Sequence, residues 1–384
     1  MPRPLPTTAR ACGERVPTHV RASREAPGHT SAAHACGPEG SCNDQERGAA
    51  MTGIIHYLET GSVDPDFNLA FEEHVLLSRR DATYLMLWQN DNTIVLGQNQ
   101  NAEAEIDQRF VREHGIRVAR RTTGGGAVYH DLGNLNYSFM ADAGDASHLM
   151  LGRFTLPIVE ALRGLGLGAH ASGRNDIVVD GRKVSGTAQR LAGGRVLHHG
   201  TLLFDSDPSL IAGALRVDPQ KFRAKRAQSV RGRIGNIRAC LARRGCDMTL
   251  PEFWAYVRQA LAGDGLVPDE LDDGELDLVR RLQAEKYDSW EWVFGRSPAY
   301  DLRNRRWWNG GELEVRASIT RERIADIRFF GDFLSLVPLG TLTDELVGCP
   351  YRRDAVREVL ERQAIGALFG GITMEEVLST VFPS

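Results

Sequence analysis

Regularly spaced hydrophobic residues begin just after position 51. The segment 53–60, GIIHYLET, is rich in β-branched and aromatic residues and predicts a strand, whereas the apolar residues of 65–80 recur at the spacing of one helical face. Segments 83–90 and 93–100 are predicted as strands, and the Asp-Asn step between them predicts a tight hairpin turn. This part of the chain therefore combines strands with a helix.

Strands and helices continue to alternate towards the C-terminus. The segment 175–191 predicts two strands joined by an Asp-Gly turn. Helices are predicted at 103–115, 153–167, near 251–262 and at 352–363, and strands at 116–121, 134–141, 196–205 and 310–333. Many hairpin-connected strands with interspersed helices indicate an α+β fold with a mostly antiparallel or mixed sheet.

The length of 384 residues favours two domains and an appendage over a single domain. Residues 1–50 are rich in Pro, Ala, Gly, Ser and Arg and lack any hydrophobic period, so a disordered N-terminal extension is expected there, with Met51 as the hypothetical natural start. We place the boundary between a large domain, 51–295, and a smaller α+β domain, 296–384, just after an aromatic-rich stretch.

The composition excludes some classes of function. No run approaches the 18 apolar residues of a membrane span. A formal net charge of -4 argues against a nucleic-acid binder that uses its whole surface. The basic stretch 221–233 is either a solvated segment or a patch for an acidic partner. Six cysteines without a CxxC pair indicate a reducing, cytoplasmic setting. Cys36 and Cys42 fit a tail better than a metal knuckle.

The stretch 120–130, RRTTGGGAVYH, contains three consecutive glycines after two arginines. Such a turn lets the backbone approach a ligand closely and direct several N–H groups at one anion, and phosphate is the obvious candidate. The turn is neither a Walker loop nor a dinucleotide fingerprint, because no Gly-Lys-Ser/Thr follows and it joins strand to strand. A plain tight connection is the alternative. Strand alternation predicts that only one of Arg120 and Arg121 faces inward.

A second group of polar residues follows in the predicted hairpin. Lys183 is followed at two-residue steps by Ser185, Thr187 and Gln189, so a regular strand would place all four on one side. From the spacing alone, an exposed surface lysine is an equally good interpretation. His198 and His199 should point to opposite sides of the next strand, and a structural role suits them better than metal binding.

These groups suit adenylation better than covalent catalysis. No nucleophile elbow is visible, and no cysteine lies near the motifs. In adenylation, a carboxylate attacks the α-phosphorus of ATP and pyrophosphate leaves, which requires positioning and charge neutralisation more than a strong base. Lys183 could bridge the carboxylate and the α-phosphate.

These residues also resemble a known family. RRTTGGGAVYHDLGNLNYSF, GRNDIVVDGRKVSGTAQR and HHGTLLF are similar, in order and spacing, to signature blocks of lipoate-protein ligases in the biotin/lipoate ligase superfamily. VDPDFNLAFEE, SVRGRIGNI and SWEWVFG resemble further blocks of that family. The resemblance covers 51–384 and includes the accessory C-terminal domain typical of bacterial two-domain ligases.

The resemblance implies ATP-dependent activation of free lipoate to lipoyl-AMP, with magnesium accompanying the ATP. The lipoyl group is then transferred to a lysine on lipoyl domains of 2-oxoacid dehydrogenase E2 subunits or on the glycine-cleavage H protein. A cytoplasmic monomer is expected, with neither nucleic acid nor membrane as a partner.

The family motifs also imply particular site residues. For ATP they imply Arg121, Gly126, Ala127, Val128, Tyr129 and Lys183, the last being the catalytic residue as well. For lipoate they imply Lys183, Leu69, Phe71, Thr123, His130, Arg190 and His199. Asn175 and Asp176 would shape the site or help to place magnesium, with no direct cluster of metal-binding side chains.

Three other functions could use the same fold. Octanoyl or lipoyl transferases pass the acyl group through a cysteine, whereas Cys240, Cys246 and Cys349 lie outside the motifs. A biotin ligase would carry a GRGRxG-like block in place of the glycine turn. A catalytically silent protein that binds lipoyl domains would keep the fold and the basic stretch but would not need Lys183.

Overall fold

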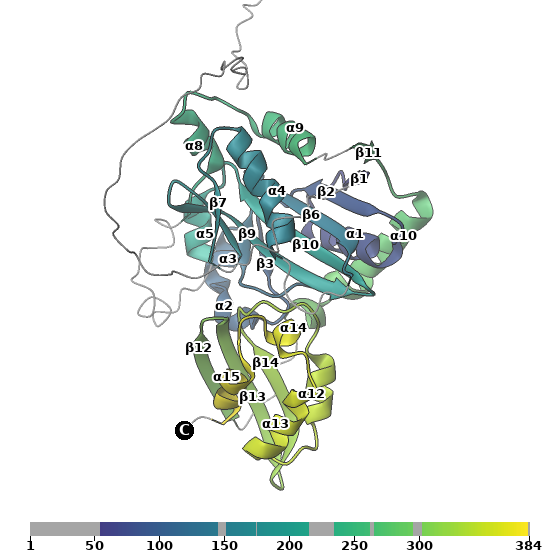
Figure 1. Cartoon of the computed structure of the whole chain (residues 1–384), viewed down its shortest axis with the longest axis vertical. Coiled ribbons are helices and arrows are strands. Elements are labelled where there is room, and N and C mark those ends of the chain that lie inside the picture. The colour runs from purple at the N-terminus through teal and green to yellow at the C-terminus, as the bar shows by residue number, and fades with distance from the viewer. Residues whose placement is uncertain are drawn as a thin grey trace, which may run out of the picture. The chain divides into compact units, whose positions relative to one another are not determined.

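The computed structural model describes residues 54–144, 151–173, 175–214, 234–261, 265–294 and 302–382 (Figure 1). The predictions for the N-terminal extension and for the basic stretch lie outside the described residues.

An eight-stranded mixed sheet organises the larger part of the chain, with the strand order β11-β1-β2-β6-β10-β9-β8-β7 (Figure 1). β1 runs parallel to β2 and β11, while the other neighbours pair antiparallel. The strands are β1 (Ile55–Glu59), β2 (Thr83–Trp88), β6 (Asn134–Asp142), β7 (His170–Ser172), β8 (Asp176–Val179), β9 (Arg182–Ala192), β10 (Arg195–Leu203) and β11 (Leu266–Pro268). This sheet confirms the α+β prediction.

Helices cover both faces of this sheet. α1 begins after Asp64, whose carboxylate accepts hydrogen bonds from two N–H groups of the first turn, and it buries Leu69, Phe71 and Val75 against β2 and β6. α4 packs its apolar side on the opposite face, where Phe154 is completely buried. The helices of this larger part of the chain include α1 (Pro65–Ser78), α4 (Leu151–Gly164), α5 (Pro208–Ala214), α8 (Ile237–Ala242), α9 (Leu250–Ala260), α10 (Asp273–Leu282), the π-helical turn η2 (Gln283–Tyr287) and α11 (Trp290–Val293).

A separate three-stranded sheet carries the glycine turn, in the order β4-β3-β5. β3 (Thr93–Leu96) runs parallel to β4 (Arg117–Arg120) and antiparallel to β5 (Val128–His130). The predicted hairpin between β2 and β3 is therefore wrong. Asn92 adopts a φ of 39° and makes the tight turn, but β2 pairs with β1 and β6, so β3 enters the other sheet.

The helix predicted at 103–115 is divided in two. α2 (Ala102–Glu105) ends before Asp107, and α3 (Gln108–Glu113) begins after it. The side chain of Asp107 accepts hydrogen bonds from the N–H groups of Arg109 and Phe110, so a new helix start replaces the continuous helix.

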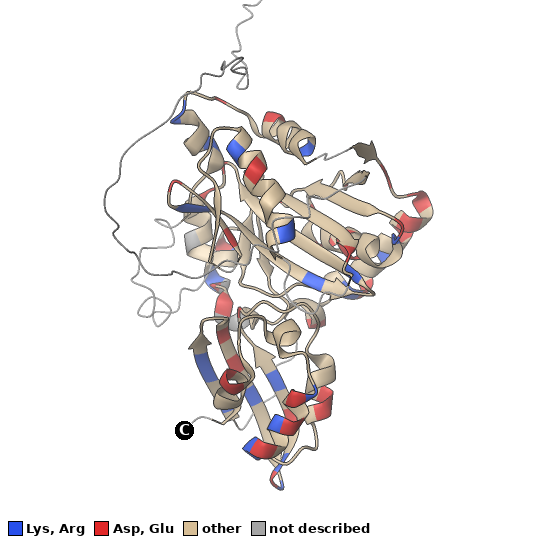
Figure 2. Ribbon diagram, in the orientation of Figure 1, with Lys and Arg blue, Asp and Glu red and all other residues tan. Residues whose placement is uncertain are grey.

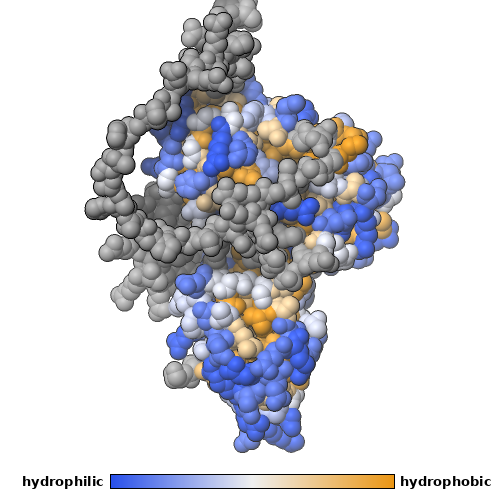
Figure 3. Space-filling view, viewed as in Figure 1, coloured by the Kyte–Doolittle hydropathy of each residue, from blue (hydrophilic) through white to orange (hydrophobic). Residues whose placement is uncertain are grey.

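Residues 302–382 form a second hydrophobic core. The antiparallel sheet β12-β13-β14 packs against four short helices. These elements include the strands predicted at 310–333 and the helix predicted at 352–363. Figure 2 shows acidic and basic residues mixed on α13, and Figure 3 shows this end to be largely hydrophilic. The elements are β12 (Leu302–Trp308), β13 (Gly311–Thr320), β14 (Arg323–Phe330), α12 (Gly340–Leu346), α13 (Arg353–Glu361), α14 (Ile365–Phe369) and α15 (Met374–Val381).

Candidate active site

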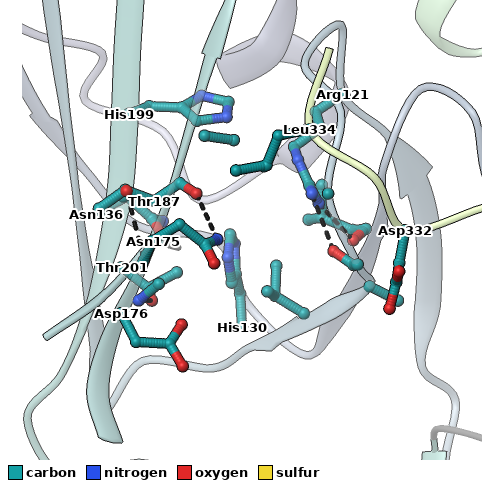
Figure 4. Close-up of a pocket in the computed structure, with 18 of the residues that line it drawn as sticks. Arg121, His130, Asn136, Asn175, Asp176, Thr187, His199, Thr201, Asp332 and Leu334 are labelled. Carbon is teal, nitrogen blue, oxygen red and sulfur yellow. Dashed lines mark hydrogen bonds between the residues drawn. The ribbon is translucent and has the colours of Figure 1, made fainter. Parts of the chain in front are cut away.

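A cavity of about 220 Å³ brings together the glycine turn and the lysine hairpin, two groups that lie far apart in the sequence (Figure 4). Its walls come from both sheets, from α1 and from residues 332–334. The lining residues are Leu69, Trp88, Val95, Arg121, Gly125, Gly126, Ala127, Val128, His130, Asn136, Asn175, Asp176, Lys183, Gly186, Thr187, Ala188, His199, Gly200, Thr201, Asp332 and Leu334.

Arg121 holds the glycine turn in shape. Its guanidinium donates hydrogen bonds to the carbonyl oxygens of Val95, Gly124 and Gly126 at 3.1, 2.7 and 2.8 Å and to the hydroxyl of Thr123 at 2.9 Å (Figure 4). Gly125 has a φ of 89°, which favours glycine at this position. The turn is therefore fixed before any ligand arrives.

Both arginines of the turn are buried, so the prediction that only one would face inward is wrong. Arg120 and Arg121 are each 6% exposed. They do alternate in direction, but Arg120 enters a second buried site, where it donates to the carbonyl oxygens of Gly97, Gln100 and Val293. Burial lowers the pKa of both groups to about 10, so both stay charged at neutral pH.

Neither arginine has a carboxylate partner within the described part of the chain. Carbonyl groups accept all the hydrogen bonds that Arg120 and Arg121 donate, apart from the one to Thr123. Neither charge is neutralised by direct contact, although the buried carboxylate of Glu72 acts on Arg121 from a distance, so the turn still offers positive charge to an anion.

Residues of the C-terminal segment also contact the turn. The N–H of Gly125 donates to the carbonyl oxygen of Phe333 at 3.0 Å, and Asn99 donates to the hydroxyl of Ser335 at 2.9 Å. Asp332 and Leu334 line the cavity. The sequence offered no signal for this contribution, because these residues follow β14 without a motif.

A chain of buried hydrogen bonds connects α1 with the glycine turn. Ser138 donates to Glu72 at 2.6 Å, and the same carboxylate lies 2.9 Å from Nδ1 of His199. The other ring nitrogen of His199 lies 2.8 Å from the hydroxyl of Thr123, which accepts from Arg121. Glu72 was not among the residues predicted for the site. A carboxylate beside buried helix positions is unusual, and this pattern could have revealed it.

Lys183 reaches the cavity because its strand contains a β-bulge. β9 pairs Ser185 with Ile177 but Lys183 with Val178, so Val184 is an extra residue. The bulge places Lys183 on the same side as Gly186, with Ser185 on the opposite side. The prediction that Lys183 shares one face with Ser185, Thr187 and Gln189 is therefore wrong, because it assumed a regular strand.

Lys183 is held by one ion pair at the cavity wall. Its Nζ lies 2.7 Å from a carboxylate oxygen of Asp176, and the two side chains are 36% and 35% exposed. Neighbouring Asn175 donates to the carbonyl oxygen of Thr187 at 2.7 Å and accepts from its N–H, which fixes the strand end (Figure 4). Lys183 can thus leave Asp176 for another anion while the strand end around it stays in place.

Most of the residues implied for the site lie together. Those that line the cavity are Leu69, Arg121, Gly126, Ala127, Val128, His130, Asn175, Asp176, Lys183 and His199. Four others do not line it. Tyr129 donates to Asn92, Phe71 packs in the α1 core, Thr123 bridges Arg121 and His199, and Arg190 pairs with Glu73 at 2.8 Å. Ligand contacts by all these residues stay predictions.

His198 and His199 point to opposite faces, as predicted. His198 stacks on Phe154 with ring centroids 5.3 Å apart, and His199 faces α1. Cys240 and Cys246 are buried in the α4-side core, while Cys349 packs against the C-terminal core, so none lines the cavity. The described residues contain no cluster of three metal-binding side chains, and none of their helices has the length and apolarity to cross a membrane.

Comparisons with known proteins define the class. Residues 64–262 match the profile of the lipoyl protein ligase A/B catalytic domain, and residues 297–381 match that of the bacterial lipoate protein ligase C-terminus. Together these profiles describe a two-part protein ligase. The chain belongs to the lipoate-protein ligase family.

Individual relatives agree with this membership. Lipoate-protein ligase LplJ of Bacillus subtilis strain 168 is 38% identical over 325 residues, covering 83% of this chain and 97% of that protein. The bipartite lipoate protein ligase from Thermoplasma acidophilum, studied with its E2 lipoyl domain, is 31% identical with a TM-score of 0.55, covering 66% of this chain and 100% of that one. Lipoate-protein ligase A bound with ATP is 28% identical with a TM-score of 0.54, covering 64% and 99%.

Proposed function

We propose that this chain activates free lipoate with ATP to form lipoyl-AMP and then transfers the lipoyl group to a lysine of an acceptor protein. The observation that carries the proposal is the meeting of a glycine turn backed by Arg121 with Lys183 in one cavity. The turn offers backbone N–H groups and fixed positive charge to phosphate, and the lysine offers a movable charge. A relative solved with ATP bound supports the nucleotide assignment.

In the first step, a carboxylate oxygen of lipoate attacks the α-phosphorus of ATP. A phosphorus–oxygen bond breaks and pyrophosphate leaves. Both reactants are anions, so repulsion between them is a large part of the barrier. Lys183 offsets this repulsion after leaving Asp176, and a half-exposed pair of this kind contributes no more than about 1 kcal/mol to stability. Asp176 is then available as an oxygen ligand for the Mg²⁺ that accompanies ATP.

In the second step, the ε-amine of the acceptor lysine attacks the acyl carbonyl carbon of lipoyl-AMP, and AMP leaves. We propose lipoyl domains of 2-oxoacid dehydrogenase complexes and the glycine-cleavage H protein as acceptors. The related archaeal ligase that was analysed with its E2 lipoyl domain supports the former.

Intact-mass analysis tests this function. Incubation with ATP, magnesium, free lipoate and a lipoyl domain is expected to add one lipoyl group to the domain and to release pyrophosphate. Omitting ATP or lipoate should abolish both changes. Modification that required an acylated carrier protein would instead indicate a transferase. Binding of the lipoyl domain without either product would indicate a silent binding protein.

A further inference from the structure

Two buried hydrogen-bond donors face one end of the cavity without a protein acceptor. His130 is 3% exposed and Asn136 is 1% exposed, and both line the cavity. Among the described residues, no hydrogen-bond partner lies within reach of Nε2 of His130 or Nδ2 of Asn136. An unpaired buried donor costs free energy, so two of them beside one cavity suggest a ligand that accepts from both.

The neighbours of His130 fix which ring nitrogen carries the proton. Nδ2 of Asn68 lies 3.1 and 2.7 Å from the carbonyl oxygens of Ser62 and Gln89 and 2.9 Å from Oδ1 of Asn90, and its two hydrogens are shared among these three acceptors. The amide nitrogen of Asn90 therefore faces Nδ1 of His130, at 3.1 Å. Because Nδ1 accepts, the proton of the neutral ring lies on Nε2, the nitrogen without a partner.

Both donors are uncharged. Burial lowers the pKa of His130 to about 3, which keeps the ring neutral at neutral pH. Asn134 donates to Oδ1 of Asn136 at 2.8 Å, which leaves Nδ2 of Asn136 without a partner. Neutral donors suit a weak, uncharged acceptor, whereas the carboxylate of an acid is better served by Lys183.

The register of the large sheet places Asn136 and Lys183 at different ends of the cavity. Trp88 lies opposite Asn136, which lies opposite Thr201 on the next strand. Thr201 accepts from the N–H of Gly186 at 3.2 Å, and Gly186 lies beside Lys183. Two strand spacings, about 10 Å, therefore separate Asn136 on β6 from β9.

The same end of the cavity holds His130. Its ring meets Trp88 edge-on, with centroids 6.2 Å apart, so both donors flank the tryptophan from different sheets. The chain of lipoate from its carboxylate carbon to the first ring sulfur is about six bonds long and spans roughly 8 Å. A carboxylate at Lys183 would thus place the sulfur-containing ring beside His130 and Asn136.

We propose that Nε2–H of His130 and Nδ2–H of Asn136 donate hydrogen bonds to the sulfur atoms of the dithiolane ring, making the cavity selective for this acid over an aliphatic acid of the same shape. The inference rests on the proposed function in taking lipoate as the substrate. Against the hydrocarbon tail of an aliphatic acid, both donors stay unpaired. Sulfur is a weak acceptor, so the preference for lipoate over that acid is modest.

The test uses calorimetry of the full chain without ATP. The two ligands are lipoate and cyclopentylpentanoic acid, in which methylene groups replace both sulfurs. The wild type is expected to bind lipoate at least about fivefold more tightly, the factor of one neutral hydrogen bond. His130→Phe and Asn136→Leu should each reduce this ratio, while His130→Gln, which keeps a donor, should retain part of it. His114→Phe, at the residue that follows α3, is the matched control, because His114 is exposed and does not line the cavity.

Two results would overturn the inference. One is equal binding of both acids by the wild type. The other is a ratio unchanged in the variants, including the case in which both affinities fall together, because a merely structural role acts on both acids alike. If His130→Phe fails to fold, Asn136→Leu decides. Pyrophosphate release is measured separately: selective binding without it would reject the proposed function alone, and release without selectivity would reject this inference alone.

Discussion

Arg121 and Lys183, which both line the cavity, are held in opposite ways. Arg121 is 6% exposed and donates three hydrogen bonds to the glycine turn and one to β3, so the turn cannot move without breaking them. Lys183 is 36% exposed and has one ion pair. One wall is therefore organised in advance by buried charge, while the other carries a charge that can change partners during a reaction.

Lys183→Ala should give the largest effect. Losing this charge removes stabilisation that is needed only during reaction, so the rate of lipoate-dependent pyrophosphate release should fall by about a hundred- to a thousandfold. The thermal midpoint should stay within about 2 °C of the wild type, because an exposed pair stabilises little. Arg182→Ala, an exposed neighbour on the same strand, is the control. If Lys183→Ala retained most of the activity, Lys183 would not be the charge that changes partners during the reaction.

Arg121→Leu should instead lower stability. The substitution leaves the buried carbonyl oxygens of Val95, Gly124 and Gly126 with fewer donors, and we expect the free energy of unfolding to fall by about 2–4 kcal/mol. Urea unfolding measures the change. Arg109→Leu is the matched control, since both side chains of its ion pair with Glu113 are solvent-exposed and losing the pair should cost less than about 1 kcal/mol. Equal losses in both variants would mean that Arg121 does not fix the turn.

Alanine substitutions at two glycines compare the glycine turn with the turn of the lysine hairpin. At Gly124 a Cβ would lie 2.6 Å from the backbone nitrogen of Ser335 and 2.8 Å from the carbonyl oxygen of Phe333, so Gly124→Ala should cost about 1–3 kcal/mol and weaken ATP binding. At Gly181 no atom lies within 4 Å, and only the φ of +74° opposes a side chain, at about 1 kcal/mol. Urea unfolding and ATP titration measure both variants. Weaker ATP binding by Gly181→Ala than by Gly124→Ala would contradict the comparison.

A last comparison concerns the protonation of His198, a buried histidine that lines neither wall of the cavity. Burial lowers the pKa of His198 to about 3 from an ordinary value of 6.5. Between these values the unfolded chain binds the extra proton, so this group makes stability fall as pH falls from 6.5 towards 3. His198→Phe should flatten the dependence by about 1 kcal/mol per pH unit, measured by urea unfolding at a series of pH values in this window. An unchanged slope would show that the imidazole is not kept neutral.

The local patterns predicted much of the fold. The helix over α1, the strands with their Asp-Gly turn, and the strand-to-strand connection at the glycines were found in the structure, because hydrophobic period and turn chemistry act over a few residues. The family motifs likewise brought most of the implied site residues into one cavity.

Long-range pairing could not be predicted in the same way. The Asp91-Asn92 turn forms, yet the partners of β3 come from 117–120 and 128–130, a choice made by the whole sheet. Glu72 faces a histidine 127 residues away, and Asp332 reaches the cavity from beyond β14. Asp332 has no signal within its own segment, and the partner of Glu72 is set by tertiary contact alone.

The extra residue at Val184 restricts how the lysine strand can change length. The face that a strand residue presents depends on whether an odd or an even number of positions separates it from its paired neighbours. One residue added between Lys183 and Val184 would turn the ammonium group towards the α4 side, among core residues such as Phe154, and a second would turn it back. Whether the charge enters the cavity therefore depends on an odd or even number of residues in this short segment as much as on the identity of the lysine.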